Sequence, residues 1–333
     1  LLNVGPMPNG KVQKEHKDIF RMLEQECKKQ GIKLFAYYSQ LDWHHPDYFP
    51  RGWTGRKTGR PEAGEWSAYL DYQNAQIKEL AENYDIAGFW FDGWWDQAPE
   101  KEDWHKTVDF RIKGIDWDLE RTYKMIHDID SKLLIGNNHH ELPFEGEDFQ
   151  MFEKDLPGKN TTGFGGADIG QLPLETCETI NHSWGFNLQD DKHKTVPELV
   201  RYLVKAAGNN ANFLLNVGPM PNGKVQKEHK EILKAMGAWL SIYGETIYGT
   251  RQGLAMTDDN IVSTRRGDKL YLHVLEVADN ELRIPDFDMK IKKAIYFKDK
   301  TPVNFRLKKR ELKLTIPEEK KEAIDTVIEI TLK

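Results

Sequence analysis

The sequence is poor in cysteine and has neither a long apolar run nor an excess of basic residues. Its two cysteines, Cys27 and Cys177, cannot form a disulfide framework, and their apolar neighbours are typical of small core residues. The longest apolar runs, such as residues 86–91, are strand-sized and too short for a membrane span. A net charge of −6 without a basic stripe argues against nucleic acid as the main partner. No signal peptide is recognisable, and a chain that begins with Leu1 is expected to be a fragment or a processed product.

What the sequence has in excess is aromatic residues. Ten tryptophans and twelve tyrosines cluster in segments such as GFWFDGWWDQ. Sugar rings stack their apolar C–H faces on aromatic rings, while their hydroxyls need fixed polar partners. Most of these aromatics suit a core, but Trp94 and Trp95 follow Asp92 and Gly93 where a strand has just ended. The pattern favours a carbohydrate ligand.

Residues 1–19 are a near-identical copy of residues 214–232, and the two segments differ only at Asp18 and Glu231. A solenoid repeat recurs several times and diverges, whereas a single faithful copy indicates recent recombination or an error of assembly. The copied unit reads as a strand, a turn and the start of a helix. We therefore treat residues 1–19 as a duplicated βα segment, distinct from the rest of the chain.

Short apolar runs alternate with amphipathic stretches up to about residue 250. The predicted strands span residues 1–4, 32–38, 86–91, 133–137, 149–152 and 213–217. Helical spacing of apolar residues predicts helices between them, one opened by a capping box of Thr195 and Glu198 and another ended by Gly244 as its C′ residue. Strands that alternate with helices over this length predict an α/β fold, a TIM-like (β/α) barrel over residues 20–250.

The pattern changes after residue 250. Helical periods disappear, and short alternating segments follow at residues 269–275, 292–297, 312–316 and 326–332. Turns rich in lysine, glutamate and aspartate separate them. The region 251–333 therefore reads as a small antiparallel β-sandwich that buttresses the barrel.

In a barrel, polar residues at the C-terminal ends of strands are the candidates for catalysis. One predicted strand runs directly into Asp92 and Gly93, and Trp90 and Asp92 point the same way because the strand period is two. An aspartate at a strand end beside several tryptophans fits the nucleophile of a glycosidase. A turn-forming Asp-Gly pair explains the same residues, and spacing alone does not separate the two interpretations.

The preceding predicted strand ends in Tyr37 and Tyr38, whose hydroxyls suit hydrogen bonds to a carboxylate or to a sugar. His44 and His45 follow in the next loop. A metal site there is disfavoured, because neighbouring histidines in extended chain face opposite ways and no spaced partner ligands accompany them. The other His-His pair, at 139–140, is judged in the same way. We therefore expect neither a metal nor a cofactor.

A hydrolase of this kind needs a second carboxylate. Glu153 follows a predicted strand and enters a loop rich in glycine and proline, from which a general acid/base reaches a glycosidic oxygen. Glu175, in LPLETC, is the competing candidate, and Glu141 and Glu145 are weaker ones.

Several segments taken together resemble glycoside hydrolase family 29, the α-L-fucosidases. They are KLFAYYSQLDWHHPDY, IAGFWFDG, LPLETCETINHSWGFN, ANFLLNVGPMPNG and YGETIYGT. The resemblance covers about residues 20 to 333, including the C-terminal sandwich.

By this resemblance, Asp92 corresponds to the family's nucleophile at the end of a WFDG strand, and Trp90 to an aromatic that lines the fucose pocket. Tyr38 corresponds to a hydroxyl near the nucleophile, with Tyr37 as the alternative. The DFQMFEKDLPG segment resembles the branch of the family in which a glutamate of this loop is the acid/base, which selects Glu153.

The resemblance also implies that Trp184, in SWGF, lies near the pocket wall, and that His44 and His45 contact the substrate. Family members carry an HWG-like and a KHHDGF-like strand, whose histidines bind fucose hydroxyls, and this sequence has neither motif. The copied segment stands where the second of those strands is expected. The predicted barrel is therefore incomplete, with six strands of its own and one borrowed strand.

The function that the resemblance implies is an exo-acting retaining α-L-fucosidase, with a fucosylated oligosaccharide or glycoconjugate as its partner and without membrane attachment. The missing histidine strands favour a second hypothesis, a catalytically impaired remnant that still binds fucosylated glycan. A retaining glycosidase for a related sugar such as galactose is the third. Family members act in the periplasm or outside the cell, and the sequence indicates neither an oligomeric state nor a linkage preference.

Overall fold

The computed structural model describes residues 18–48, 63–97, 115–164, 168–254, 259–276 and 280–333. The chain divides into two compact units, residues 1–150 and 151–333. The predicted strand at 1–4 and most of the duplicated segment 1–19 lie outside the described residues. The domain limits predicted from the sequence, at 19/20 and 250/251, stay predictions.

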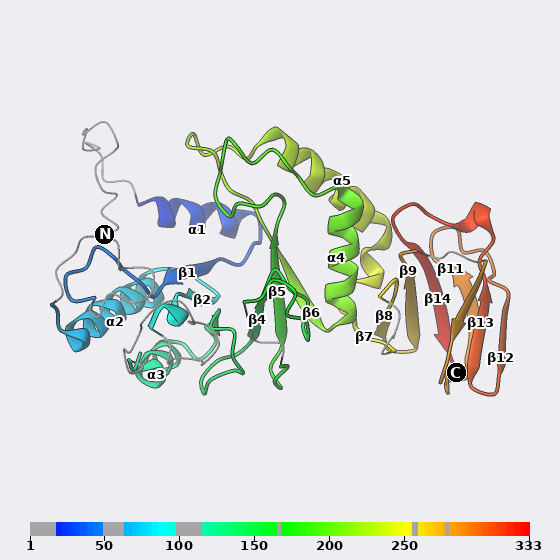
Figure 1. The fold of residues 1–333 in the computed structure, drawn as a ribbon, viewed down its shortest axis with the longest axis horizontal. Helices are drawn as coiled ribbons and strands as arrows, with labels where there is room; N and C mark the ends of the chain where they lie inside the picture. Colours follow the sequence, from blue (N-terminus) through cyan, green and yellow to red (C-terminus); the bar gives the residue numbers. More distant parts are fainter. Residues whose placement is uncertain (1–17, 49–62, 98–114, 165–167, 255–258, 277–279) are drawn as a thin grey trace. The chain divides into compact units, whose positions relative to one another are not determined.

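The first unit alternates helices and strands (Figure 1). Its elements are α1 (Ile19–Lys29), β1 (Phe35–Ser39), α2 (Trp66–Asn83), β2 (Gly88–Asp92), the short helix η2 (Trp94–Gln97), α3 (Leu119–Ile129) and β3 (Leu134–Asn137). The three strands form one parallel sheet in the order β1-β2-β3, and they confirm the strands predicted there. Residues that follow these strands meet at one edge of the sheet, because parallel strands share their C-terminal edge.

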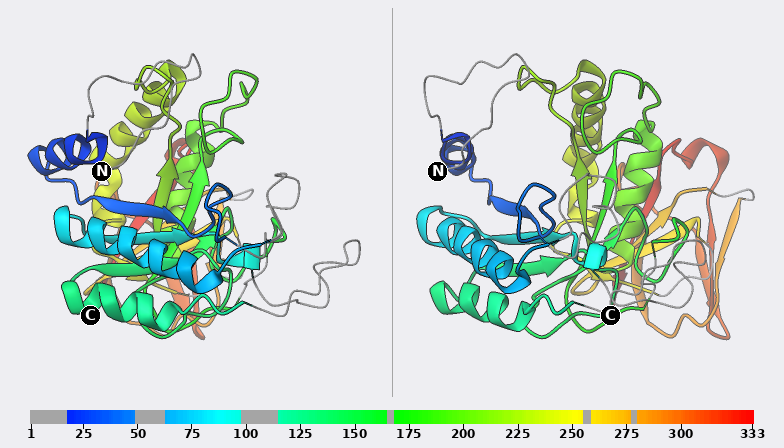
Figure 2. Two further views of the ribbon diagram at one scale, coloured as in Figure 1. Left: turned by 90° about the vertical axis from the view of Figure 1, so that its left-hand side faces the viewer. Right: turned by 60° about the vertical axis from the view of Figure 1, so that its left-hand side comes forward.

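Helices cover the sheet and bury its apolar residues. Ile77 of α2 and Ile126 of α3 are fully buried in one cluster with Phe89 and Ile135 of the sheet. Figure 2 shows α2 and α3 side by side. Burial of an isoleucine side chain contributes about 1.5–3 kcal/mol, so this layer is a main source of the unit's stability.

The duplicated segments differ in one residue, Asp18 in the first copy and Glu231 in the second, and these two residues have different positions relative to a helix. Asp18 caps α1, and its carboxylate accepts the backbone N–H of Arg21 at 2.8 Å. That hydrogen bond, more than any other influence, holds the pKa of Asp18 below its ordinary value. Glu231, at the equivalent position of the second copy, lies inside helix α5 (Lys227–Tyr243). Aspartate is a preferred N-cap residue and glutamate is a good helix former, so each copy carries the residue that suits its place.

An aromatic cluster fixes the loops that follow β1 and β2. Tyr48, Tyr69 and Trp117 are buried in it. The Tyr48 hydroxyl donates to Asp96 Oδ2 at 2.6 Å, and the Tyr69 hydroxyl donates to the Gln40 carbonyl at 2.5 Å. These bonds satisfy buried polar groups that otherwise cost about 1–3 kcal/mol each, so both loops are held close to the sheet edge.

The second unit contains β4 (Gln150–Glu153), which begins at its boundary, β5 (Leu174–Thr179), α4 (Val196–Gly208), β6 (Ala211–Asn216) and α5. The sheet order is β4-β5-β6, with β5 and β6 parallel. The predicted capping box is confirmed: the Thr195 hydroxyl accepts the Glu198 N–H at 3.4 Å, and the Glu198 carboxylate accepts the Thr195 N–H at 2.6 Å.

Strand β5 was not predicted, because most of its buried residues are polar: Thr176, Glu178 and Thr179 are buried there beside Leu174 and Cys177. Thr176 and Thr179 are fully buried. The Thr176 hydroxyl donates to the Asp155 carbonyl at 2.7 Å, and Glu178 pairs with the Lys194 ammonium at 3.2 Å. These partners come from outside the strand, so no periodicity within the LETCET segment could reveal it.

The remaining strands pair antiparallel in two sheets. The first, in the order β11-β14-β9-β8-β7, contains β7 (Arg251–Gln252), β8 (Ile261–Arg266), β9 (Lys269–Val274), β11 (Ile291–Tyr296) and β14 (Thr326–Leu332). The second, in the order β10-β13-β12, contains β10 (Glu281–Ile284), β12 (Phe305–Lys308) and β13 (Glu311–Thr315). Along β14, Ile328 and Ile330 join Leu312 of the second sheet in one cluster, while Val327 joins Val204 of α4 in another.

The prediction that Gly244 is the C′ residue of α5 is wrong. Gly244 is the C-cap of α5 with φ of −55°, and the chain continues into the short helix η3 (Gly244–Thr246). A Cβ there would lie 2.9 Å from the ring of Tyr248, an exposed side chain that would have to shift.

The α/β class predicted from the sequence is confirmed, since parallel sheets alternate with helices in both units. The described strands do not by themselves establish the incomplete barrel or the C-terminal sandwich, and both stay predictions. Within the described residues, no helix combines the length and the apolar character that a bilayer span requires.

Candidate active site

Asp92 is the last residue of β2 and lies at the C-terminal edge of the first parallel sheet. Gly93 follows with φ of +103°, which only glycine adopts readily, and a Cβ there would lie 2.9 Å from the Leu41 side chain. The Gln40 N–H donates to the Asp92 carbonyl at 2.6 Å. The turn therefore closes tightly against the loop after β1, and the Asp92 carboxylate is left partly exposed at the edge.

Four donors surround the Asp92 carboxylate. Oδ2 accepts from the Tyr37 hydroxyl at 2.7 Å. Oδ1 accepts from the Gly93 N–H at 2.9 Å, from the Trp95 indole N–H at 3.2 Å and, at a longer 3.4 Å, from the Asn138 amide. An Asp-Gly turn requires only the bond from Gly93, so the other three donors give the carboxylate an orientation that a turn does not need.

The register of β1 and β2 places Tyr37, and not Tyr38, on the same face of the sheet as Asp92. Ser39 pairs with Asp92 and Tyr37 pairs with Trp90, so Tyr37 lies diagonally across from Asp92 on the same face. The Tyr37 and Trp90 rings stack with centroids 5.5 Å apart and an interplanar angle of 22°. This stacking holds the Tyr37 hydroxyl toward the carboxylate.

The expectation that Tyr38 is the hydroxyl beside the nucleophile is corrected by the structure. Tyr38 points to the other face of β1, where its hydroxyl donates to Gln76 Oε1 of α2 at 2.8 Å. Burial raises the pKa of Tyr38 well above its ordinary value. Tyr37, the alternative left open by the sequence, takes the contact with Asp92.

A pair of neighbouring tyrosines allows a matched test. We expect Tyr37→Phe to lower kcat for an aryl α-L-fucoside by about tenfold, because a hydrogen bond to a charged group contributes about 1.5–3 kcal/mol and solvent replaces part of it. Tyr38→Phe should leave kcat within about twofold and lower the melting temperature instead, since its hydroxyl bonds a helix. Equal effects of both variants on kcat would contradict the positioning role of Tyr37.

Asn138 is a site residue that the sequence reasoning missed. It directly follows β3, and its backbone N–H donates to the Phe91 carbonyl at 2.9 Å. The rule that selected Asp92, a polar residue at a strand end, applies equally to Asn138 and could have found it. Trp95, flagged only as an aromatic outside the obvious core, lies within hydrogen-bond distance of the same carboxylate.

His44 and His45 lie in the loop after β1. The Asp42 carboxylate accepts the backbone N–H of both, at 2.8 and 3.1 Å. The His45 ring packs on Tyr72 of α2 with centroids 4.3 Å apart, whereas His44 is exposed. A substrate contact by either histidine stays a prediction.

A buried polar network lies behind the site, after β3. His139 Nε2 lies 2.9 Å from Glu147 Oε1, to which the Tyr123 hydroxyl also donates at 3.1 Å. Burial and the charge of Glu147 raise the pKa of Tyr123 well above its ordinary value. The His139 ring stacks on Phe144 at 4.1 Å, so this histidine is a satisfied core group. Among the described residues, no three side chains of metal-ligating type are placed to hold a metal ion.

In the second unit, Glu153 is the last residue of β4, and Lys154 turns the chain with φ of +56°. The Lys154 N–H donates to the Cys177 carbonyl of β5 at 2.8 Å. Burial, and then the charges of Glu153 and Glu175, raise the pKa of the Cys177 thiol well above its ordinary value. Glu175 is the second residue of β5, away from the C-terminal strand end that Glu153 occupies. Strand ends are where catalytic groups of such sheets lie, which favours Glu153 over Glu175.

Asp155 anchors the loop that follows Glu153. Its carboxylate accepts the backbone N–H groups of Thr161 and Thr162, each at 3.0 Å, and both of their hydroxyls. Burial by itself would raise the pKa of Asp155, but these hydrogen bonds hold it below its ordinary value. The loop after Glu153 is therefore closed on itself by an ionised side chain.

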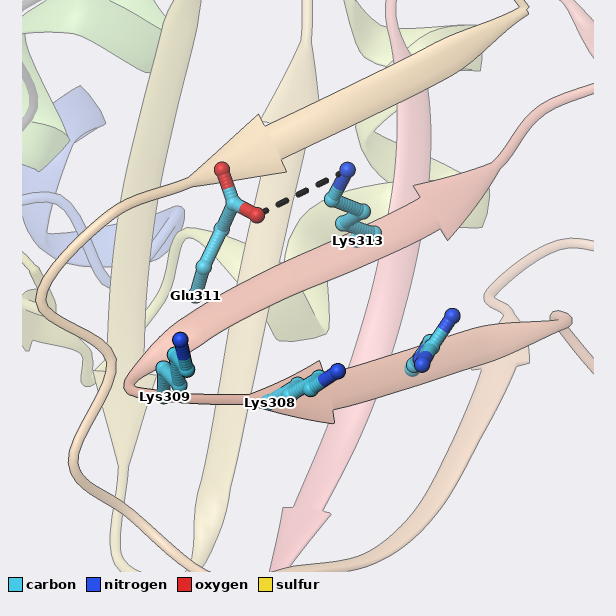
Figure 3. Close-up of a pocket in the computed structure, with 5 residues that line it drawn as sticks. Lys308, Lys309, Glu311 and Lys313 are labelled. Carbon is cyan, nitrogen blue, oxygen red and sulfur yellow. Dashed lines mark ion pairs between the residues drawn. The ribbon is translucent and has the colours of Figure 1, made fainter.

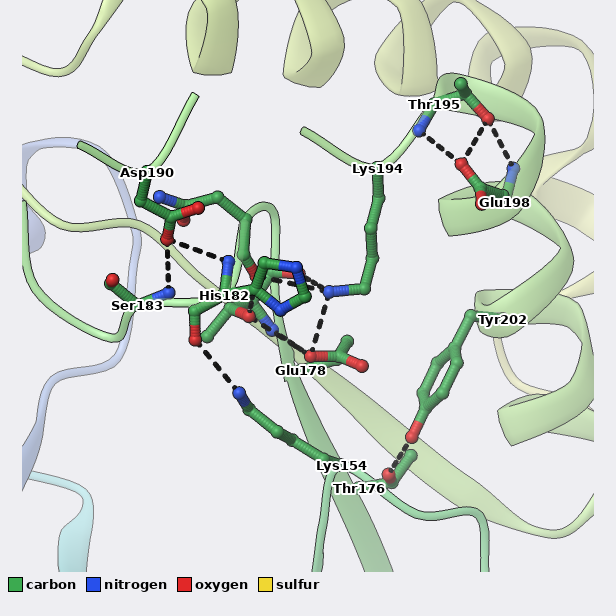
Figure 4. A network of polar contacts seen from close by, with 12 residues as sticks. Lys154, Thr176, Glu178, His182, Ser183, Asp190, Lys194, Thr195, Glu198 and Tyr202 are labelled. Carbon is green, nitrogen blue, oxygen red and sulfur yellow. Dashed lines mark hydrogen bonds and ion pairs between the residues drawn. The ribbon is translucent and has the colours of Figure 1, made fainter. Parts of the chain in front are cut away.

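Trp184 lies in a loop fastened from two strand ends. Figure 4 shows one of these fastenings, from Lys154 to His182 of the same loop. Its carbonyl accepts the Asn216 amide at 2.7 Å at the end of β6. The Lys154 ammonium donates to the His182 carbonyl at 3.0 Å and lies 5.0 Å from the Trp184 ring centroid. A Cβ on Gly218 would lie 2.5 Å from this loop's backbone, so glycine permits the close approach. The partly exposed Trp184 ring is thus held in place beside the residue that follows Glu153.

Comparison with known proteins gives consistent matches. A family model described as Alpha-L-fucosidase matches residues 11–245. The structure of α-L-fucosidase isoenzyme 1 from Paenibacillus thiaminolyticus is 30% identical with a TM-score of 0.77, over 95% of this chain and 76% of that chain. A trapped covalent intermediate of an α-L-fucosidase from Bacteroides thetaiotaomicron shares the fold, with a TM-score of 0.75 and 21% identity over 97% of this chain and 74% of that chain.

A curated relative, the human tissue α-L-fucosidase, is 26% identical over 276 residues, which cover 80% of this chain and 53% of that protein. The chain spans about half the length of the curated relatives it matches.

Proposed function

The chain belongs to the α-L-fucosidase family, and we propose that it is an exo-acting retaining α-L-fucosidase that releases terminal L-fucose from glycans. The observation that carries the proposal is the Asp92 carboxylate at a strand end, oriented by the Tyr37 hydroxyl and the Trp95 indole. A carboxylate fixed in this way beside stacked aromatic rings suits a nucleophile that attacks a sugar.

In the proposed mechanism Asp92 attacks the anomeric carbon and Glu153 donates a proton to the leaving oxygen as its bond to that carbon breaks. The product of this step is a fucosyl ester of Asp92. Glu153 then takes a proton from water, the water oxygen attacks the anomeric carbon, and Asp92 leaves. Two inversions retain the configuration. The covalent intermediate trapped in the Bacteroides relative supports a double displacement in this fold.

The preference for fucose is proposed to come from an apolar wall. Trp90, stacked on Tyr37, and Trp184, held near Lys154, offer apolar ring faces. Fucose carries a methyl group where galactose carries CH₂OH. Burying a hydroxyl without a partner costs about 1–3 kcal/mol, which disfavours galactose.

The incomplete (β/α) barrel with a C-terminal antiparallel sandwich is part of the proposal, and a fucosylated oligosaccharide or glycoconjugate is the proposed partner. The structural similarity to the Paenibacillus enzyme supports this architecture. The alternative is a catalytically impaired protein that still binds fucosylated glycan.

An assay with paired aryl glycosides tests the proposed function. We expect the aryl α-L-fucoside to be hydrolysed with a kcat/KM about tenfold to a hundredfold above that of the aryl galactoside, as the buried hydroxyl predicts. Proton NMR during turnover should show the α anomer of fucose first. Fucose binding by calorimetry without turnover would support the impaired alternative, and the β anomer appearing first would rule out retention.

A further inference from the structure

A concave basic surface lies on the β12–β13 hairpin, remote in sequence from every residue of the candidate active site. It forms a hollow of about 490 Å³ that is open to solvent (Figure 3). The hollow is lined by Arg306, Lys308, Lys309, Glu311 and Lys313. Four of these five side chains are cationic, although the chain as a whole has a net charge of −6.

The strand register aligns like charges across the whole sheet. Lys313 of β13 pairs with Arg283 of β10 on one side and with Arg306 of β12 on the other. Directly opposed like charges destabilise a sheet, so this row of three cations is unfavourable for folding. On β10 and β13 the opposite face of the sheet is buried, for example at Leu282 and Leu314, which forces the charged residues of these strands to share the solvent face. We call Arg283, Arg306, Lys308, Lys309 and Lys313 the basic face.

The nearby carboxylates neutralise only part of this charge. Glu281 lies 2.7 Å from Arg283 and 3.7 Å from Lys313, and Glu311 lies 3.6 Å from Lys313. Arg306, Lys308 and Lys309 form no ion pair with any of the described residues, and all three are exposed. Ligand anions therefore have three cations available.

The turn of the hairpin adds a second unfavourable feature. Lys308 pairs with Glu311, which leaves a two-residue loop of Lys309 and Arg310 with φ of +51° and +62°. Such turns favour asparagine and glycine, which tolerate the left-handed conformation. Lys309 and Arg310 occupy these positions instead, although the left-handed conformation is less favourable for them than for asparagine or glycine. Formation of the turn does not require cationic residues.

Protection of a sheet edge explains only part of the pattern. Lysine on an edge strand discourages pairing with other chains, and β12 is an edge strand. Lys313, however, lies on the central strand β13, where no edge needs protection. Its place between Arg283 and Arg306 is accounted for by an anionic ligand that lies across the strands.

We propose that the basic face binds a polyanionic glycan, whose sulfate esters or carboxylates contact Arg306, Lys308 and Lys309 and continue along the row to Lys313 and Arg283. Neighbouring strands lie about 4.8 Å apart, so the row presents closely spaced cations, and guanidinium groups bind such anions through paired hydrogen bonds. The choice of a glycan rests on the proposed function, because an exo-hydrolase gains from a second contact with its polymeric substrate.

Other polyanions fit less well. Glu281 and Glu311 interrupt the cations, so the basic face lacks the long run of phosphate contacts that nucleic acid offers. The exposed apolar side chains of β12, Phe305 and Leu307, alternate with Arg306 and Lys308, so they do not project from the basic face as membrane insertion would need.

Affinity electrophoresis of the full chain in gels with dextran sulfate, polygalacturonate or neutral dextran tests the proposal. We expect at least one anionic polymer to retard the protein and neutral dextran not to retard it. High salt should abolish the retardation. The double variant Arg306→Gln/Lys308→Gln should bind about tenfold more weakly, the loss that two partly exposed charge contacts produce. The matched control Lys230→Gln/Lys234→Gln removes two exposed cations from α5 and should bind as the parent does.

Each outcome of these experiments supports or overturns the proposed glycan site. Retardation by dextran sulfate alone identifies sulfate esters as the ligand, and retardation by polygalacturonate alone identifies carboxylates. Equal weakening in both double variants would mean that only net charge matters, which overturns the site. Tighter binding of a DNA duplex or of phosphatidylserine vesicles, sensitive to Arg306→Gln/Lys308→Gln, would overturn the choice of a glycan. Turnover of a small aryl fucoside should be the same in all variants, so failure of the hydrolase proposal is seen separately from failure of this one.

Discussion

Replacing Asp92 by alanine is expected to lower kcat for an aryl α-L-fucoside by about 10⁴-fold or more, because the covalent route through the fucosyl ester is lost. The variant should fold, since Asp92 is partly exposed and the tight turn depends on Gly93 and on the backbone bond from Gln40. Steady-state kinetics with a chromogenic fucoside measures the effect. Asp71→Ala, which removes an exposed aspartate from α2, is the matched control and should stay within about twofold.

Azide distinguishes a lost nucleophile from a damaged fold. In Asp92→Ala a small anion can enter the space left by the carboxylate, attack the anomeric carbon and displace the leaving group in one step. A single displacement inverts the configuration, so the expected product is β-fucosyl azide. Unchanged kcat in Asp92→Ala, or no azide product with a native circular dichroism spectrum, would refute the assignment.

Replacing Glu153 by glutamine is the second large effect that we expect. Loss of a general acid/base lowers the rate by about 10²–10⁴-fold, most severely for substrates with a poor leaving group. An aryl fucoside with a strongly acidic phenol needs little proton donation, so its fucosylation step should be nearly normal and a burst of phenol should precede slow release of fucose. Azide should here yield α-fucosyl azide, because it attacks the fucosyl ester from the side that water uses.

Glu175→Gln is the matched control for this experiment. Glu175 lies near the same thiol as Glu153, Cys177, but at the second position of β5. Its replacement should leave both the leaving-group dependence and the pH profile of kcat/KM unchanged. If Glu175→Gln shows the burst and Glu153→Gln does not, the two glutamates exchange roles and the acid/base assignment is wrong.

Some secondary-structure elements could be predicted from the sequence and others could not. The strand before Asp92 was predicted because its residues are apolar throughout, as a strand covered on both faces requires. Strand β5 was missed because Thr176 and Glu178 are satisfied by Asp155 and Lys194, which lie outside the strand. The prediction for the C-terminal end of α5 was wrong at Gly244, because the chain continues there into η3 with a right-handed conformation.

Some residues of the candidate site could likewise be predicted from the sequence, and others could not. A strand-end rule made Asp92 and Glu153 candidates, and the family resemblance selected them over the competing interpretations. The same rule applied to β3 would have found Asn138. It could not choose between Tyr37 and Tyr38, since neighbouring residues of a strand alternate faces and either face can be the catalytic one. The choice needed the pairing of Ser39 with Asp92.

The sequence by itself determined the α/β class, most of the strands, the capping box at Thr195 and the candidate carboxylates, because these depend on residues close together in the chain. Only the tertiary structure decided that Tyr37 holds Asp92 and that Arg283, Lys313 and Arg306 form one row. These facts depend on register between strands distant in sequence, where a shift of one residue turns every side chain to the other face. Register is set by packing of the whole sheet, and no local pattern encodes it.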